Sequence, residues 1–363
     1  MSSNDKDFDY KIRFQRILWK MGFWTRSEIP VLAYSTNTYI DNLKKHDLTD
    51  LDVYGELLNT DFSINKYIAD CKSGRQVKST ERVFWLKGIM EFTKADKGFL
   101  IKKNVTDHIR LILDSMNIYA IDNNNLLELE KLYNTSSINE LFSKEYYIER
   151  EKIIGSLSEE YKKIYQYLSQ RYWYNSNHVN LNVILTMLNK NQFYKCFERN
   201  NKSHLFLLLE NIILLTRVIF ECCNYVLHRN IADIPQAVLE YIHGGVTGYN
   251  QKKNILREIK SMVSTYLPNE AINVEENDIK PLYYQPLLEL ILSIITEPLL
   301  AKDIIRYLEI FQHEVILEKK YDFNQYFANN YSNITLKLAK DIIRFYSSFT
   351  KVNSDIFESI LKV

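Results

Sequence analysis

The sequence predicts an α+β protein in which a small mixed β-sheet flanked by helices is followed by a mainly helical region. Three observations lead to this fold class. Between residues 48 and 133 strand-like and helix-like segments alternate in the order β-β-α-β-α-β. After residue 137, apolar periodicity of helix length dominates. Only 9 Gly and 6 Pro occur in 363 residues, which argues against a loop-rich β protein.

The first predicted element is an amphipathic helix over Tyr10–Met21. Its apolar residues recur at helical spacing, and Gly22 follows as a stop signal. The chain after Pro30 is predicted to be extended over Val31–Tyr34, and residues 37–43 are predicted to form a short turn or helix.

Two strands and a helix are predicted next. The strands lie on either side of the polar turn Asn59-Thr60-Asp61, and the second of them ends near Ser73 and Gly74. Thr80–Ala95 reads as a helix that has Ser79 or Thr80 as its N-cap. The remaining elements are a strand at Gly98–Lys102, a helix at Val105–Met116, a strand at Ile118–Ile121 and a helix at Leu126–Tyr133.

A domain boundary is expected at the polar Asn-Thr-Ser-Ser stretch at residues 134–137. It divides the chain into domain 1–135, which holds the sheet, and domain 136–363, which is helical. Prolines fall near the starts of the helices or in the connectors, as helix punctuation requires. The predicted helices are 161–172, 179–188, 204–227, 234–243, 250–266, 286–295, 298–313 and 336–349.

Composition narrows the function classes. The net charge is only +1, so nucleic-acid binding requires a local basic region. The four cysteines show no zinc spacing, and no phosphate-binding glycine loop or serine-hydrolase motif occurs. The longest apolar runs contain charges, so no membrane span is expected. The polar N-terminus does not resemble a secretory leader, and a cytoplasmic location is expected.

One group of charged residues stands out on the two central strands. Asp70 and Lys72 are two residues apart, so on a strand they point to one face while Cys71 points to the other. Asp52 lies on the preceding strand, and Asp50 shares its face. Two acids and a lysine at the ends of neighbouring strands suit a hard divalent cation and an activated water.

This arrangement resembles the PD-(D/E)xK nuclease superfamily, which has a restriction-endonuclease-like fold. The matching residues are Asp52, Asp70 and Lys72, followed by a helix that begins with Glu-Arg, and the resemblance covers about the first third of the chain. It implies a nuclease that depends on Mg²⁺ or Mn²⁺ and hydrolyses phosphodiester bonds, with DNA as the expected substrate. Microbial defence systems and mobile elements are the contexts that the resemblance suggests.

The resemblance also implies roles for the individual residues. Asp52, Asp70 and the backbone carbonyl of Cys71 would be metal ligands. Lys72 would orient or deprotonate the attacking water, or stabilise the phosphate in the transition state.

The chain departs from the family pattern in the first helix, which often supplies one more acid. The acid available here is Asp9, while Gln15 lies further in, and Glu28 is a further candidate. Asp50 competes with Asp52, or makes an outer contact. Glu81 could close the metal site, or it could simply complement the helix N-terminus. The departure motivates the alternative hypothesis of a catalytically inactive nuclease-fold subunit that acts as a nucleic-acid or protein-binding scaffold.

A local basic region surrounds these acids. Residues 66–103 contain ten Lys or Arg against four Asp or Glu, a net charge of +6. The residues predicted to contact nucleic acid are Arg75, Lys78, Arg82 and Lys87. The competing explanation is a solvated face of a Lys-rich protein.

The helical domain has three candidate roles, namely a partner-binding module, a sensor or a nucleic-acid clamp. An ATPase or helicase subunit is a candidate protein partner, and a homo-oligomer remains open. A third hypothesis is a helical interaction protein whose N-terminal motif arose by chance.

Overall fold

The computed structural model describes residues 7–36, 43–73, 79–266 and 279–362, and the chain forms two compact units. The unit that holds the sheet extends past residue 135, where the sequence placed the boundary. The first unit contains Met1–Asn59, Ile64–Trp173 and Glu309–Tyr331. The second unit contains Thr60–Ser63, Tyr174–Leu308 and Ser332–Val363.

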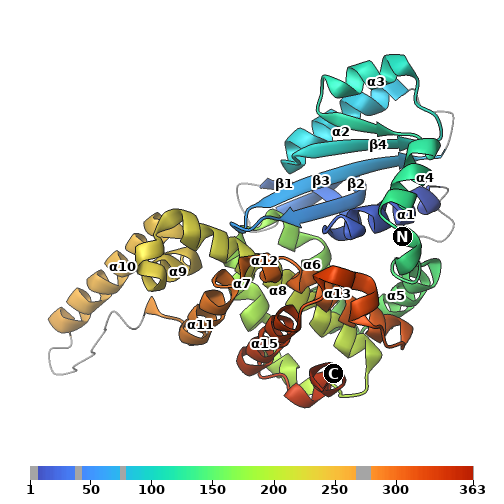
Figure 1. Cartoon of the computed structure of the whole chain (residues 1–363). Helices are drawn as coiled ribbons and strands as arrows, with labels where there is room; N and C mark the ends of the chain where they lie inside the picture. The colour runs from blue at the N-terminus through green and yellow to red at the C-terminus, as the bar shows by residue number, and fades with distance from the viewer. Residues whose placement is uncertain (1–6, 37–42, 74–78, 267–278, 363) are drawn as a thin grey trace. The chain divides into compact units, whose positions relative to one another are not determined.

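The first unit is built on a mixed sheet of five strands in the order β1-β2-β3-β4-β5. β1, β2 and β3 are antiparallel neighbours, whereas β3, β4 and β5 run parallel (Figure 1). This layout confirms the predicted α+β class. The strands are β1 (Trp24–Thr36), β2 (Leu43–Leu58), β3 (Ile64–Lys72), β4 (Lys97–Lys102) and β5 (Ile118–Ile121).

β1 is longer than the extended segment Val31–Tyr34 that the sequence predicted. It begins at Trp24, shortly after the first helix, and Trp24 pairs with Glu56 of β2. Most of the turn or helix predicted at residues 37–43 lies outside the described residues, and Leu43 belongs to β2.

Helices cover both faces of the sheet. α1 (Phe8–Lys20) and α4 (Asn123–Leu132) contribute apolar side chains to a core on one face. α2 (Ser79–Thr93) and α3 (Asp107–Asp114) do so on the other face. The period-2 alternation of the strands assigns each residue to a face.

On β3 the alternation decides where the charged residues point. Ala69 and Cys71 are buried in the core beneath α1, and Ile68 is buried in the core beneath α2. Asp70 therefore lies on the α2 face, and its side chain points away from that of Cys71, as the strand pattern predicted. Trp19, Phe23 and Trp24 are buried and belong to the core.

Further helices complete each unit, and no helix among the described residues is long and apolar enough to cross a bilayer. The first unit also contains α5 (Lys144–Ser156), α6 (Glu159–Ser169), α14 (Phe323–Phe327) and the second half of α13 (Ile304–Leu317). The second unit contains α7 (Asn177–Thr186), α8 (Lys202–Arg229), α9 (Ile234–Ile242), α10 (Gly245–Tyr266), α11 (Tyr284–Ile295), α12 (Pro298–Ala301), α15 (Asn333–Thr350) and α16 (Glu358–Leu361).

The core of the first unit contains a neutral histidine. The His313 ring is fully buried, stacks on Tyr146 at 3.8 Å between centroids and packs edge-on against Phe142. Neither ring nitrogen has a hydrogen-bond partner among the described residues. Burial, followed by the charges of Arg26, Arg150 and Arg16, lowers the pKa of His313 to about 3.

We expect the His313→Phe variant to lose part of the acid sensitivity of the wild-type protein. Between pH 6.5 and pH 3 the unfolded chain binds a proton at His313 and the folded chain does not, so stability falls as the pH falls. From pH 7 to pH 5 this group removes about 2 kcal/mol of folding free energy. Urea unfolding at both pH values should show a smaller loss for the variant, and equal losses would contradict the assignment.

Candidate active site at the end of the β2–β3 pairing

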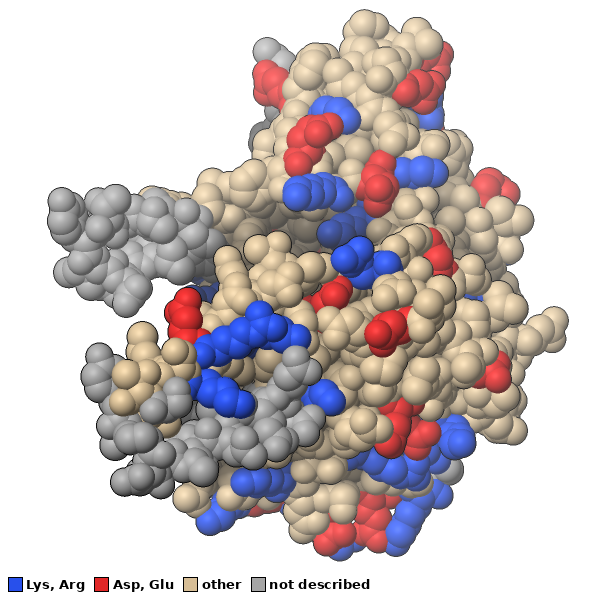
Figure 2. Space-filling view, turned by 90° about the vertical axis from the view of Figure 1, so that its left-hand side faces the viewer, with Lys and Arg blue, Asp and Glu red and all other residues tan. Residues whose placement is uncertain are grey.

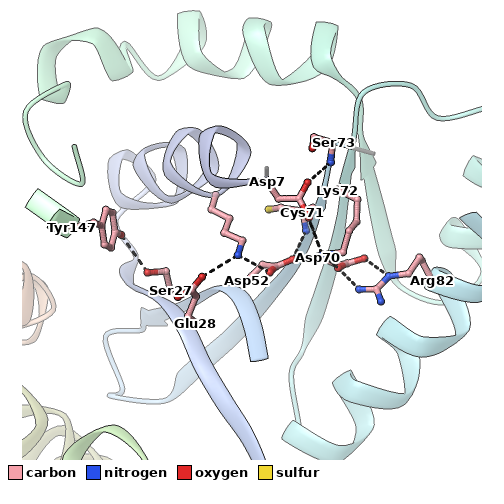
Figure 3. Close-up of polar contacts among 11 residues, drawn as sticks. Asp7, Ser27, Glu28, Asp52, Asp70, Cys71, Lys72, Ser73, Arg82 and Tyr147 are labelled. Atoms are coloured by element: carbon pink, nitrogen blue, oxygen red, sulfur yellow. Dashed lines mark hydrogen bonds and ion pairs between the residues drawn. The ribbon is translucent and has the colours of Figure 1, made fainter. Parts of the chain in front are cut away.

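The acids predicted on the two central strands lie where these strands stop pairing. The β2–β3 ladder ends at Val53 and Ala69, so Asp52 and Asp70 are the next residues on their strands. Asp52 Oδ2 accepts a hydrogen bond of 2.8 Å from the backbone N–H of Cys71. The Asp52 side chain thus satisfies a β3 donor beyond the last paired residues (Figure 3).

The Lys72 ammonium group brings these residues together. Its Nζ atom lies 3.1 Å from Asp52 Oδ2, 3.3 Å from Asp70 Oδ1 and 3.0 Å from the Cys71 carbonyl oxygen. The three groups named as metal ligands therefore meet around one point. Burial alone would lower the pKa of Lys72, but Asp70 and Asp52 outweigh it, and the pKa is raised. Lys72 is accordingly a cation at neutral pH.

The fourth oxygen around Lys72 comes from Asp7, which the sequence analysis missed. Asp7 Oδ2 lies 3.5 Å from Lys72 Nζ, and Asp7 Oδ1 accepts a hydrogen bond of 2.5 Å from the Ser73 N–H. The predicted acid Asp9 is exposed instead and pairs with Arg13 at 3.4 Å. Asp7 directly precedes α1 and contacts the chain at the end of β3. Asp9 is the second residue of α1 and is exposed. An acid directly before the first helical residue was the available signal.

Asp70 is held by Arg82 of α2. The Asp70 side chain is only 1% exposed, and both of its oxygens accept hydrogen bonds from the Arg82 guanidinium, one of them at 2.8 Å from Nε. Arg82 also lies over the Trp85 ring, 3.9 Å from its centroid. Arg82 was predicted to contact nucleic acid, but in this structure its planar group is engaged with the acid of the site.

A second lysine, which sequence reasoning also missed, contacts Asp52 from α1. Lys11 Nζ lies 3.1 Å from Asp52 Oδ1 and 3.1 Å from Glu28 Oε1. The Lys11 side chain is only 6% exposed. Each carboxylate oxygen of Asp52 thus faces its own ammonium group. The apolar periodicity that predicted α1 gave no reason to expect a buried lysine on that helix.

Glu28 is held at the site by an unusual backbone. Ser27 pairs with Val53 and Ile29 with Leu51, so Glu28 stands opposite Asp52. Glu28 has φ of 56°, a left-handed conformation that is strained for a side chain within a strand. Lys11 contacts both Glu28 and Asp52, so the Glu28 carboxylate lies beside the site.

The structure describes three of the other predicted residues, Asp50, Glu81 and Lys87. Asp50 pairs with Pro30 in the ladder, and burial followed by the charge of Glu28 raises its pKa. Glu81 is exposed in the first turn of α2, and Lys87 pairs with Glu91 at 2.8 Å on the same helix. Arg75 and Lys78 lie outside the described residues.

The oxygens around Lys72 are of the types that bind a divalent ion, but they lie too far from their common centre to coordinate one. Carboxylate and carbonyl oxygens are the donors that Mg²⁺ prefers, at about 2.0–2.1 Å. Here they surround an ammonium at 3.0–3.5 Å. Among the described residues, no three His, Cys, Asp or Glu side chains are placed so that they could hold a metal ion as they stand. Metal binding would therefore require Lys72 to leave this point and the oxygens to close in.

Comparisons of the chain with protein-family models, with curated proteins and with solved structures give no match. Function is therefore inferred from the site itself. The resemblance to PD-(D/E)xK nucleases rests on Asp52, Asp70 and Lys72 and on the two strands that carry them.

Proposed function

We propose that this chain is a metal-dependent nuclease that hydrolyses phosphodiester bonds, with DNA as its substrate. The observation that carries the proposal is the meeting of Asp52, Asp70 and the Cys71 carbonyl around Lys72 Nζ. This group differs from a chance cluster of exposed charges, because Asp70 is buried and accepts two hydrogen bonds from Arg82. Buried, paired charges that converge at one point are found at functional sites more often than elsewhere, which supports the proposal.

The residues divide into two roles. Asp52, Asp70, Asp7 and the Cys71 carbonyl would hold Mg²⁺ or Mn²⁺, which when bound supplies a more acidic water and charge neutralisation at phosphate. Lys72 has a raised pKa, so it favours the electrostatic role over that of a general base. Arg82 fixes the orientation of the Asp70 carboxylate through two hydrogen bonds.

Charge on the surface bears on how a polyanion would approach. On the face drawn in Figure 2, Lys and Arg side chains are interspersed with Asp and Glu and separated by uncharged surface. The described part of that face thus shows no continuous basic surface. Residues 66–103 carry an excess of positive charge along the chain, and two of these cations, Lys72 and Arg82, contact Asp70 on β3.

The test is cleavage of plasmid DNA, single-stranded DNA and RNA by the purified full chain with Mg²⁺ or Mn²⁺. We expect cleavage by the wild type, none by Asp70→Asn, and wild-type cleavage by Asp114→Asn, a control at an exposed aspartate of α3. The same ions should raise the unfolding midpoint of the wild type but not of Asp70→Asn. The proposal would be refuted if the wild type showed no cleavage and its unfolding midpoint did not change with either ion.

A second candidate function is a non-catalytic scaffold of the same fold. The observation that favours it is the charge balance of the site, where Lys11, Lys72 and Arg82 already neutralise the carboxylates. In that case the ion pairs hold β2, β3, α1 and α2 together. Nucleic-acid binding that is unaffected by divalent ions, without cleavage, would favour this function.

Asp7 and Asp9 provide a matched pair of variants. We expect Asp7→Asn to weaken Mg²⁺ or Mn²⁺ binding by about tenfold, since it removes one charged oxygen from the group around Lys72. Asp9→Asn should leave metal binding unchanged, because Asp9 is exposed and pairs with Arg13. Isothermal titration with Mn²⁺ measures both affinities. If Asp9→Asn weakened metal binding and Asp7→Asn did not, Asp9 rather than Asp7 would be the additional metal ligand.

A further inference from the structure

The Asp52 carboxylate connects two ammonium groups. Its Oδ2 atom lies 3.1 Å from Lys72 Nζ, and its Oδ1 atom lies 3.1 Å from Lys11 Nζ. Each ammonium also contacts a second acid. Asp70 Oδ1 lies 3.3 Å from Lys72 Nζ, and Glu28 Oε1 lies 3.1 Å from Lys11 Nζ. Figure 3 shows Asp52 between Glu28 and Asp70. The site thus has two cation positions that share one bridging carboxylate.

A shared carboxylate is also a way to hold two metal ions. In two-metal hydrolytic sites the ions lie about 3.5–4 Å apart, and a carboxylate can give one oxygen to each of them. Carboxylate oxygens accept hydrogen bonds from an ammonium group as readily as they ligate a hard cation. The acids therefore suit either kind of cation at each position. Which kind a position holds depends on whether its lysine can leave.

The two lysines differ in their access to water. Lys72 is the last residue of β3, and its side chain is 25% exposed, so it can turn towards solvent. The Lys11 side chain is only 6% exposed. Lys11 belongs to α1, and Phe14, Ile17 and Leu18 of that helix are buried in the core against the sheet. Withdrawal of the Lys11 ammonium would have to open this packing, whereas withdrawal of the Lys72 ammonium would not.

We propose that Lys11 is a built-in cation that takes the place of a second metal ion, so that the site binds a single Mg²⁺ or Mn²⁺, between Asp52 and Asp70. This inference rests on the nuclease function proposed above. Glu28, which stands opposite Asp52 in the ladder, is then the counter-ion of Lys11 and not a metal ligand. The Lys11 ammonium supplies at Asp52 Oδ1 the positive charge that a second ion supplies in two-metal sites.

The test is the number of Mn²⁺ ions bound by the full chain, counted by isothermal titration. We expect one ion per wild-type chain and two per Lys11→Gln chain, because the shorter, uncharged amide leaves Asp52 Oδ1 and Glu28 available to an ion. Electron paramagnetic resonance gives a second readout, since two ions that share Asp52 couple magnetically and a single ion does not. Lys131→Gln, at an exposed pair with Glu128 on α4, should bind one ion as the wild type does.

A double variant tests the role of Glu28. Lys11→Gln combined with Glu28→Gln should bind one ion again, because the second position has then lost one of its two carboxylates. Two coupled ions in this double variant would show that Glu28 does not form the second position, and would overturn the assignment of Glu28 as the counter-ion of Lys11.

The remaining outcomes separate this inference from the proposed function. Two ions bound by the wild type, or only one bound by Lys11→Gln, would overturn the inference, and cleavage by the wild type would still support the nuclease. A Lys11→Gln chain that does not fold even when it is prepared with Mn²⁺ would also overturn the inference, because the ion then fails to replace the ammonium. A wild type that binds no Mn²⁺ and cleaves no DNA would instead refute the proposed function.

Discussion

Replacing Lys72 with alanine should reduce metal-dependent DNA cleavage at least about 100-fold, the size expected when a positioned charge or proton-transfer group is lost. The same change should not weaken metal binding. The Lys72 ammonium stands between Asp52, Asp70 and the Cys71 carbonyl, at the point that an ion would use. Its removal takes away a cation that competes with the metal ion and leaves the carboxylates without one of their charge partners, which favours metal binding.

The two effects therefore have opposite signs in one variant. We expect Mg²⁺ or Mn²⁺ to raise the unfolding midpoint of Lys72→Ala at least as much as that of the wild type. Lys87→Ala is a suitable control, because Lys87 pairs with Glu91 on the surface of α2. Loss of both metal binding and cleavage in Lys72→Ala would mean that Lys72 is a structural support, and retained cleavage would remove it from the mechanism.

Replacing Asp70 with alanine should lower the free energy of unfolding of the first unit by about 3 kcal/mol, the lower end of the range for one broken partner of a buried ion pair. The Arg82 and Lys72 side chains are 19% and 25% exposed, so water partly compensates for the lost carboxylate. All four tryptophans of the chain, at positions 19, 24, 85 and 173, belong to this unit. Urea unfolding followed by tryptophan fluorescence thus reports on it directly.

A double-mutant cycle separates the ion pair from general damage. Arg82→Met in the Asp70→Ala background should recover part of the lost stability, because it removes the cation that has lost its partner. Glu91→Ala, which breaks the exposed pair with Lys87, should leave the unfolding curve almost unchanged. If Asp70→Ala behaved like Glu91→Ala, the site would be too hydrated for its charges to matter to stability.

Local pattern predicted the last two strands of the sheet closely. The strand Ile118–Ile121 has the bounds that its alternation predicted, and β4 differs from the predicted strand by one residue. The same alternation placed Asp70 and Lys72 away from the Cys71 side chain, because side-chain direction on a strand follows from position alone. The extent of β1 was underestimated, since its pairing with β2 supplies stability that no local signal carries.

The partners of the charged residues were beyond local pattern. Arg82 was predicted to contact phosphate because the sequence shows its positive charge. The sequence does not show that Arg82 lies within hydrogen-bond distance of Asp70. Lys11 and Asp7 reach the site only because α1 packs across the sheet next to the point where β2 and β3 stop pairing. Contacts between residues tens of positions apart depend on that packing, and one sequence contains no record of it.

The amino-acid sequence alone determined the class of the fold, the strand that bears Asp70 and Lys72, and the helical nature of the rest of the chain. Those properties follow from side-chain periodicity and backbone geometry within single elements. The tertiary structure decided that Asp7 rather than Asp9 joins the site, that Lys11 and Arg82 neutralise its acids, and that Lys72 occupies its centre. Electrostatic partnership depends on distance in space, and only the packing of separate elements sets that distance.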